Sequence, residues 1–125
     1  MADHLASEPI PDSALLFRRV HRLFWNPDSG HVSSGAFSDP EMSVNWQAFT
    51  TAKETSVEDS TGNTVAVVSL VAGYCRTLEQ TVVHDPLPEK DGKPANLAHT
   101  LVRGRKSKPV KHKLRDASVL VWRLS

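Results

Sequence analysis

The sequence predicts an α+β protein, a single compact domain with a mixed sheet of about five strands and about three helices. Its 125 residues, 39% hydrophobic and 23% charged, are typical of one globular domain that can bury a core without a disulfide or a metal. Short apolar runs bounded by turn residues indicate strands, and apolar residues at helical spacing indicate helices. Residues 1–9 are expected to form a flexible N-terminus, so that the domain spans residues 10–125.

The first apolar segment, residues 15–20, fits two structures. Leu16 and Val20 are spaced as on one face of a helix, whereas Leu15 and Phe17 with their neighbours form a short apolar run that also suits a strand. Periodicity alone does not separate the two alternatives.

The next segments are bounded by turn residues. Pro27 and Gly30 predict a turn over residues 26–30. A strand is expected over residues 31–37. After a second turn at residues 38–41, the alternation of apolar residues predicts a strand over residues 42–46.

A short helix is expected over residues 52–57, with Thr50 or Thr51 as its N-cap. Turn residues at 59–63 close it. The β-branched run that follows predicts a strand over residues 64–69.

Helical spacing resumes after that strand and predicts a helix over residues 70–80. Residues 81–84 are expected to form a strand. Three prolines and Gly92 then make residues 85–96 an exposed loop. The strand and helix on either side should bury six residues: Val65, Val67, Leu70, Tyr74, Cys75 and Leu78.

A strand over residues 97–103 is expected to end at Gly104. Ser107 as N-cap, with Pro109 in the first turn, predicts a helix through the basic segment. Beyond residue 115 the pattern fits a continued helix, but residues 119–122 would also make a buried strand.

Charge is distributed unequally along the chain. Residues 1–63 carry four Lys/Arg and nine Asp/Glu, a net charge of −5, whereas residues 64–125 carry eleven and five, a net charge of +6. Much of this positive charge lies in a segment of thirteen residues without an acid, which we call the basic segment: Arg103, Arg105, Lys106, Lys108, Lys111, Lys113 and Arg115.

The basic segment predicts a small binding or accessory module that contacts an anionic partner such as nucleic acid, a nucleotide or an acidic protein. Clustered cations and free N–H groups at a helix start can contact phosphates. The alternative is a solvated face that balances the acidic half of the chain, within the molecule or in a subunit of a bacterial multiprotein complex.

A second group of polar residues flanks the loop. If its flanking strands pair, His84, Asp85, Asn96 and His99 would lie near one sheet edge, where they could supply a base, an orienting carboxylate and a ligand clamp. The alternative is that Asp85 and Asn96 brace the loop ends through bonds to the backbone.

An enzyme is the other functional alternative. Arg18 and Arg19, followed by Ser34, resemble the opening arginine and the second-strand serine of some ADP-ribosyltransferases. This resemblance implies a nucleotide-handling site with His84 and His99 as further catalytic candidates, although the later-strand glutamate of those enzymes has no clear counterpart.

Several segments together are similar to a recurrent pattern of short uncharacterised bacterial proteins. They are Ile10-Pro11-Asp12, residues 16–21, 33–37 and 42–44, His84-Asp85-Pro86-Leu87-Pro88 and Asn96-Leu97-Ala98-His99. The resemblance implies an extended conformation for residues 15–20 and implies no catalytic residue. Residues 89–94 depart from the pattern and suggest a loop that tolerates insertion.

The remaining features bound the location and the chemistry. No apolar run approaches the roughly 20 residues of a membrane span, and residues 1–11 lack the basic and apolar regions of a signal peptide, so we expect a cytoplasmic protein without membrane contact. Cys75 is the single cysteine and is expected to be a buried structural thiol. His31, His84 and His99 lack a short ligand spacing, so neither a metal nor a cofactor is predicted.

Overall fold

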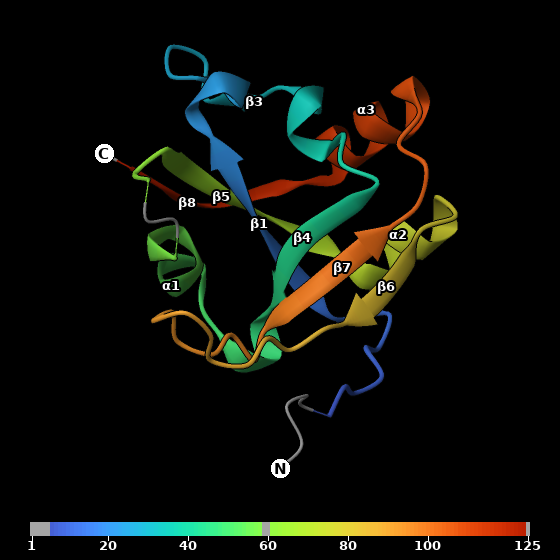
Figure 1. Ribbon diagram of the computed structural model, residues 1–125. Helices are drawn as coiled ribbons and strands as arrows, with labels where there is room; N and C mark the ends of the chain where they lie inside the picture. Colours follow the sequence, from blue (N-terminus) through green and yellow to red (C-terminus); the bar gives the residue numbers. More distant parts are fainter. Residues whose placement is uncertain (1–5, 59–60, 125) are drawn as a thin grey trace.

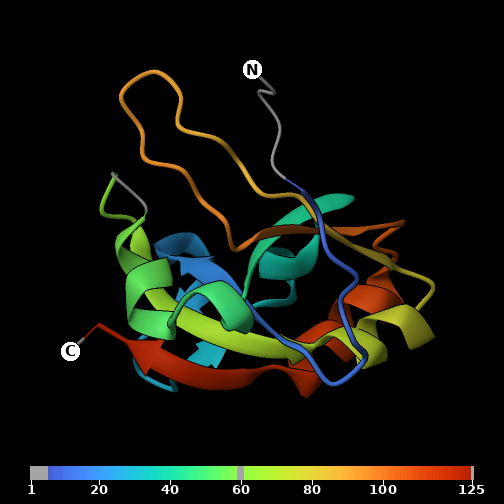
Figure 2. The same cartoon turned by 90° about the horizontal axis from the view of Figure 1, so that it is seen from below.

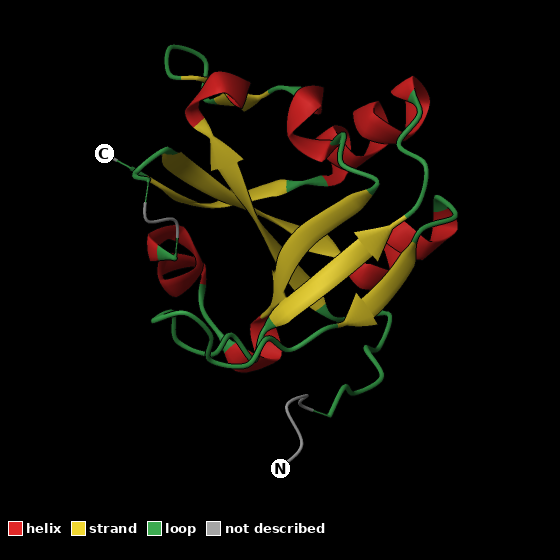
Figure 3. Cartoon of the chain, in the orientation of Figure 1, coloured by secondary structure: helices red, strands yellow, loops and turns green. Residues whose placement is uncertain are grey.

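The computed structural model describes residues 6–58 and 61–124. Its main sheet has six strands in the order β6-β7-β4-β1-β5-β8, and two further strands, β2 and β3, form a small ribbon (Figure 1). The strands are β1 (Leu15–His21), β2 (Trp25–Asn26), β3 (His31–Val32), β4 (Glu41–Trp46), β5 (Thr64–Val71), β6 (Thr81–His84), β7 (His99–Arg103) and β8 (Val119–Arg123). The helices are α1 (Ala52–Val57), α2 (Ala72–Thr77) and α3 (Lys108–Ala117), with short 3-10 turns η1 (Arg22–Phe24), η2 (Ser34–Phe37) and η3 (Gln47–Phe49) (Figure 3).

The α+β class is confirmed. The main sheet has six strands, against about five expected, and each neighbouring pair in it is antiparallel, where a mixed sheet was expected. Four of the five neighbouring pairs join strands that are not consecutive in the chain, and the pattern within one strand does not reveal the direction of such a partner. The expected flexible N-terminus falls largely on residues 1–5, which lie outside the described part of the chain.

Strand β1 settles the ambiguity of residues 15–20 in favour of the extended form. It lies between β4 and β5 and pairs with both. Leu16 and Val20, which would share one face of a helix, also share one face of the strand and are fully buried there. The alternation of a central strand therefore accounts for the same apolar residues.

The two faces of the sheet have different coverings. One face contributes Leu16, Val44 and Val68 to the main core, on which η2 and the Leu114 side of α3 pack. The opposite face carries Phe17 and Val67, which are buried under α1, together with a row of polar residues. Ser43, Asn45 and His99 belong to this row of polar residues.

Several expected elements have different bounds. Residues 34–37 form the turn η2 rather than the end of a strand, because Gly35 lets the ring of Phe24 approach to within 2.8 Å of where a Cβ would lie. Leu70 and Val71 extend β5, so that α2 begins at Ala72 rather than residue 70. Residue 97 lies in the loop, and β7 begins at His99.

Other elements match the prediction closely. Thr51 caps α1 over Ala52–Val57, and Ser107 caps α3. Strand β6 covers Thr81–His84, and residues 85–98 form a loop that protrudes from the body of the molecule (Figure 2). Part of the turn expected at 59–63 lies outside the described residues.

The end of the chain was only partly anticipated. Helix α3 stops at Ala117, and Val119–Arg123 forms strand β8 rather than a continued helix. Strand β8 lies at the edge of the sheet, and its residues Val119, Leu120 and Val121 are exposed instead of buried. Across residues 6–58 and 61–124, we find no helix with the length and apolar character needed to cross a membrane.

Candidate functional site

The basic segment runs from the end of β7 through α3, and three of its cations are already engaged. Arg103 Nε lies 3.0 Å from a carboxylate oxygen of Glu41, the residue opposite it on β4. Arg115 Nε lies 2.9 Å from Asp116. Lys106 Nζ donates to the carbonyls of Val102 and Gly104 at 2.9 and 3.1 Å.

Lys106 therefore differs from the other lysines of the segment. Burial lowers the pKa of Lys106 from its ordinary value, while the nearby Asp39 opposes that shift. An ammonium group that caps two backbone carbonyls from a half-buried position stabilises the turn after β7 and is poorly placed to reach a phosphate in solvent.

The other four cations, Arg105, Lys108, Lys111 and Lys113, have no ion-pair partner within the described residues. Lys108, Lys111 and Lys113 belong to α3, which Leu114 anchors in the core. The structure thus presents a smaller cationic surface than the sequence suggested, held on one rigid helix and the residues just before it.

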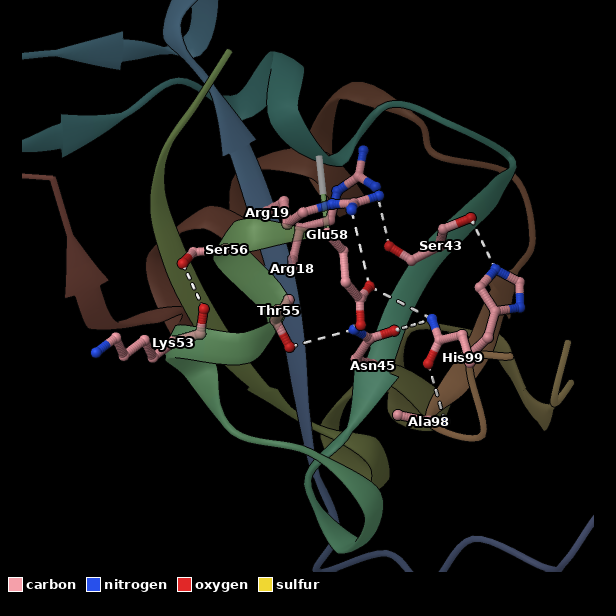
Figure 4. A network of polar contacts seen from close by, with 11 residues as sticks. Arg18, Arg19, Ser43, Asn45, Lys53, Thr55, Ser56, Glu58, Ala98 and His99 are labelled. Carbon is pink, nitrogen blue, oxygen red and sulfur yellow. Dashed lines mark hydrogen bonds and ion pairs between the residues drawn. The ribbon is translucent and has the colours of Figure 1, made fainter. Parts of the chain in front are cut away.

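On the second face of the sheet, the ring of His99 lies between Asp85 and Ser43, and Figure 4 shows its contact with Ser43. His99 Nδ1 lies 3.2 Å from a carboxylate oxygen of Asp85 and 3.0 Å from its carbonyl oxygen. Nε2 of the same ring lies 3.3 Å from Ser43 Oγ. We call these residues, Asp85, His99 and Ser43, the triad.

A second polar group adjoins the triad. Asn45 is buried and donates to Thr55 Oγ1 at 3.2 Å and to Glu58 Oε2 at 2.9 Å, while its own amide oxygen accepts from Asn96 at 3.1 Å. Arg19 completes the group through a loose ion pair of 3.8 Å with Glu58 (Figure 4). The side-chain amides of Asn45 and Asn96 are hydrogen-bonded to each other and to neighbouring side chains. This group therefore holds α1 and the loop against the sheet.

The two groups line one shallow hollow of about 20 Å³. Among its lining residues are Arg19, Ser43, Glu58, Asn96 and His99. One water needs roughly 10–15 Å³, so the hollow has room for about one water, and any larger ligand must sit at its mouth.

His84 lies on the opposite face from His99. Its Nε2 donates to the carbonyl of Leu97 at 2.7 Å, and its Nδ1 accepts from the amide of Glu8 at 3.0 Å. The ring stacks on Phe49 with a centroid distance of 5.2 Å. Both ring nitrogens are thus occupied, and His84 joins the loop to the N-terminal segment.

The residues expected to cluster around the loop accordingly lie on two different faces of the sheet. Asp85 and His99 meet and Asn96 lies close by, but His84 is turned away because successive residues of a strand point to opposite faces. Ser43 and Glu58 were not identified from the sequence. The alternation of residues 42–46 already placed Ser43 opposite the buried Met42 and Val44, and that was the available signal.

The residues of the ADP-ribosyltransferase resemblance are also divided. Arg18 Nε donates to the carbonyl of Ala36 at 3.1 Å and its Nη1 to that of Ser43 at 2.9 Å. These bonds commit its guanidinium to holding η2, the turn that contains Ser34. Arg19, the next residue, faces the hollow on the other side of the sheet.

A comparison with protein-family models, curated proteins and solved structures gives no match. No group of three or more His, Cys, Asp or Glu side chains is arranged to hold a metal within the part of the chain that the structure describes.

The core expected around Cys75 is confirmed in part. Val67, Leu70 and Cys75 are buried, Val65 and Leu78 are half-buried, and Tyr74 is exposed at the surface of α2. Burial raises the pKa of Cys75 to about 11, an effect that Lys106 opposes.

Cys75 should react with a thiol reagent such as 5,5′-dithiobis(2-nitrobenzoate) far more slowly in the native protein than in the unfolded chain. At pH 8 a thiol with a pKa of about 11 is only about 0.1% thiolate. Because the folded state favours the neutral thiol, this group also makes the protein less stable as the pH rises from about 9 towards 11. Labelling at the rate of the unfolded chain at pH 8 would contradict this placement.

Proposed function

We propose that the protein is a small cytoplasmic binding or accessory module that contacts a polyanion, in particular the phosphates of nucleic acid, through Arg105, Lys108, Lys111 and Lys113. The observation that carries the proposal is that these four cations pair with no acid of the described residues. By contrast, Arg103 and Arg115 pair with acids, and Lys106 donates to two backbone carbonyls. The positive charge of the four cations is therefore available to a partner.

The form of this surface favours a polyanion over a small ligand. The cations lie along a helix and the turn before it, without a pocket around them, and an extended row of phosphates needs no pocket. No aromatic side chain is interleaved with the cations, so bases would have no stacking platform. The proposed binding is electrostatic and independent of nucleotide sequence.

Affinity for a short DNA duplex, measured by fluorescence anisotropy, should fall with salt. Engagement of three or four phosphates gives a slope of log affinity against log salt of about −3. The triple variant Arg105→Ala/Lys108→Ala/Lys113→Ala should reduce the slope to about −1 and weaken binding, with little change in melting temperature because exposed charges contribute little to stability.

A matched control removes equal charge elsewhere. Lys53, Lys90 and Lys93 are exposed and lie outside the basic segment, so Lys53→Ala/Lys90→Ala/Lys93→Ala should keep the slope of the parent protein. If both triple variants change the slope equally, DNA binding does not depend on the cations of the basic segment, and the proposal is wrong.

The alternative is a subunit of a bacterial multiprotein complex in which the same cations face an acidic protein. It predicts that the basic triple variant loses association with a protein partner while DNA binding of the parent is already negligible. The ADP-ribosyltransferase alternative gains no support from the geometry, because the Arg18 guanidinium is committed to two backbone carbonyls.

A further inference from the structure

We propose that Ser43 as nucleophile, His99 as base and Asp85 as orienting carboxylate hydrolyse small carboxylic esters at the surface of the sheet. This activity is separate from the proposed polyanion contact and uses none of the four cations that carry it. Ser43 lies in β4, His99 lies in the neighbouring strand β7, and Asp85 directly follows β6.

The strand register accounts for the alignment. β6 pairs with β7 so that His84 faces Thr100, and the next pair outwards joins Asp85 to His99 through a bond of 2.8 Å from the Asp85 amide to the His99 carbonyl. β7 pairs with β4 so that His99 faces Asn45. Ser43 is thus the diagonal neighbour of His99 on the same face, within reach of a long side chain.

The bonds fix one imidazole tautomer. Both partners of Nδ1, the carboxylate and the carbonyl of Asp85, can only accept while that carboxylate is ionised, so Nδ1 carries the proton. Nε2 then presents its lone pair to the hydroxyl of Ser43. This is the arrangement that lets a histidine take a proton from a serine.

The backbone around Ser43 is held in place. Its carbonyl accepts a bond of 2.9 Å from Arg18, and its strand is paired with β7 at Leu101. A rigid nucleophile loses little freedom when the substrate arrives. Solvent reaches the triad, since the Asp85 side chain is 46% and the His99 side chain 15% exposed.

The reaction proceeds in two balanced steps. Ser43 Oγ attacks the ester carbonyl carbon while its proton passes to His99 Nε2, and the C–O bond to the alcohol breaks as His99 returns the proton to the leaving oxygen. Water then attacks the acyl-serine with His99 as base, which releases the carboxylic acid and restores the serine. No oxidant, reductant or other co-reactant is needed.

Arg19 can stabilise the oxyanion, and the hollow can hold the water of the second step; the triad itself provides neither function. The guanidinium of Arg19 lines the same hollow and is held to Glu58 only at 3.8 Å, so it can turn towards the oxyanion that develops on the carbonyl oxygen. The hollow has room for about one water, as the second step requires, and the ester itself sits at its mouth.

The test uses the full chain with p-nitrophenyl acetate and a biotin-tagged ethoxy fluorophosphonate. We expect the fluorophosphonate to modify Ser43, as located by peptide mass spectrometry. Ser43→Ala and His99→Gln should each lower kcat/KM at least about a hundredfold. The controls Ser29→Ala and His31→Ala change an exposed serine and an exposed histidine far from the triad and should keep the parent rate.

Asp85 is a positioning residue. Variants of Asp85 distinguish its role in orienting His99 from a merely structural role in bracing the loop. Asp85→Asn should lower kcat with KM nearly unchanged, and Asp85→Glu should restore part of it. Circular dichroism and melting temperature verify that each variant is folded. Ester hydrolysis no faster than in buffer, labelling spread over other residues, or a Ser43→Ala variant with the parent rate would each overturn the proposal.

Discussion

Replacing Phe37 with alanine is expected to lower the free energy of unfolding by about 3–5 kcal/mol. Phe37 is the largest side chain that is fully buried, with 0% exposure, and it lies at the end of η2, on which α3 packs. The alanine variant loses the free energy of transferring the ring from water into the core. It also leaves a cavity, because the close-packed antiparallel sheet beneath cannot rearrange to fill the space.

Urea denaturation followed by tryptophan fluorescence measures this effect. Leu23→Ala is the matched control, because Leu23 is 79% exposed and its replacement should change stability by less than about 0.5 kcal/mol. Equal stability of the two variants would mean that η2 does not pack on the core as described. The Phe37→Ala variant should also loosen α3 and so weaken the proposed polyanion contact.

Replacing Arg18 with alanine is expected to lower the free energy of unfolding by about 2–4 kcal/mol, because hydrogen bonds from a charged donor contribute about 1.5–3 kcal/mol each. Arg18 donates to the carbonyls of Ala36 and Ser43 and so joins η2 to β4. Burial lowers the pKa of Arg18, while Asp39 acts in the opposite direction.

Arg19→Ala is the matched control for Arg18→Ala, because both variants remove an arginine from the same strand. The loose, partly exposed ion pair of Arg19 with Glu58 should contribute less than about 1 kcal/mol, so Arg19→Ala should unfold close to the parent in urea. A stability loss in Arg19→Ala as large as that in Arg18→Ala would contradict the assignment of the two arginines to opposite faces.

Local chemistry was sufficient for the elements whose signals lie within a few residues. Thr51 and Ser107 marked the starts of α1 and α3 because a capping side chain bonds to an amide only a few positions ahead. The prolines and Gly92 defined the exposed loop after β6 for the same reason. These assignments require no knowledge of the rest of the chain.

Tertiary pairing decided the elements whose apolar pattern suits more than one structure. Leu15–His21 became a strand because β4 and β5 lie on either side of it. Val119–Arg123 became a strand through pairing with β5, and it lies at the edge of the sheet with most of its apolar side chains exposed. Periodicity within one segment contains no information about such partners.

The candidate sites divide in the same way. The sequence by itself determined the cluster of cations in residues 103–115, and it predicted the nearness of Asp85 and His99 on the condition that the strands flanking the loop pair, as they do. Only the tertiary structure decided that Lys106 turns inwards, that His84 faces the core and that Ser43 meets His99. The physical reason is that side-chain composition is local, whereas the strand register, which sets the face and the neighbours of each side chain, arises from contacts between segments far apart in the chain.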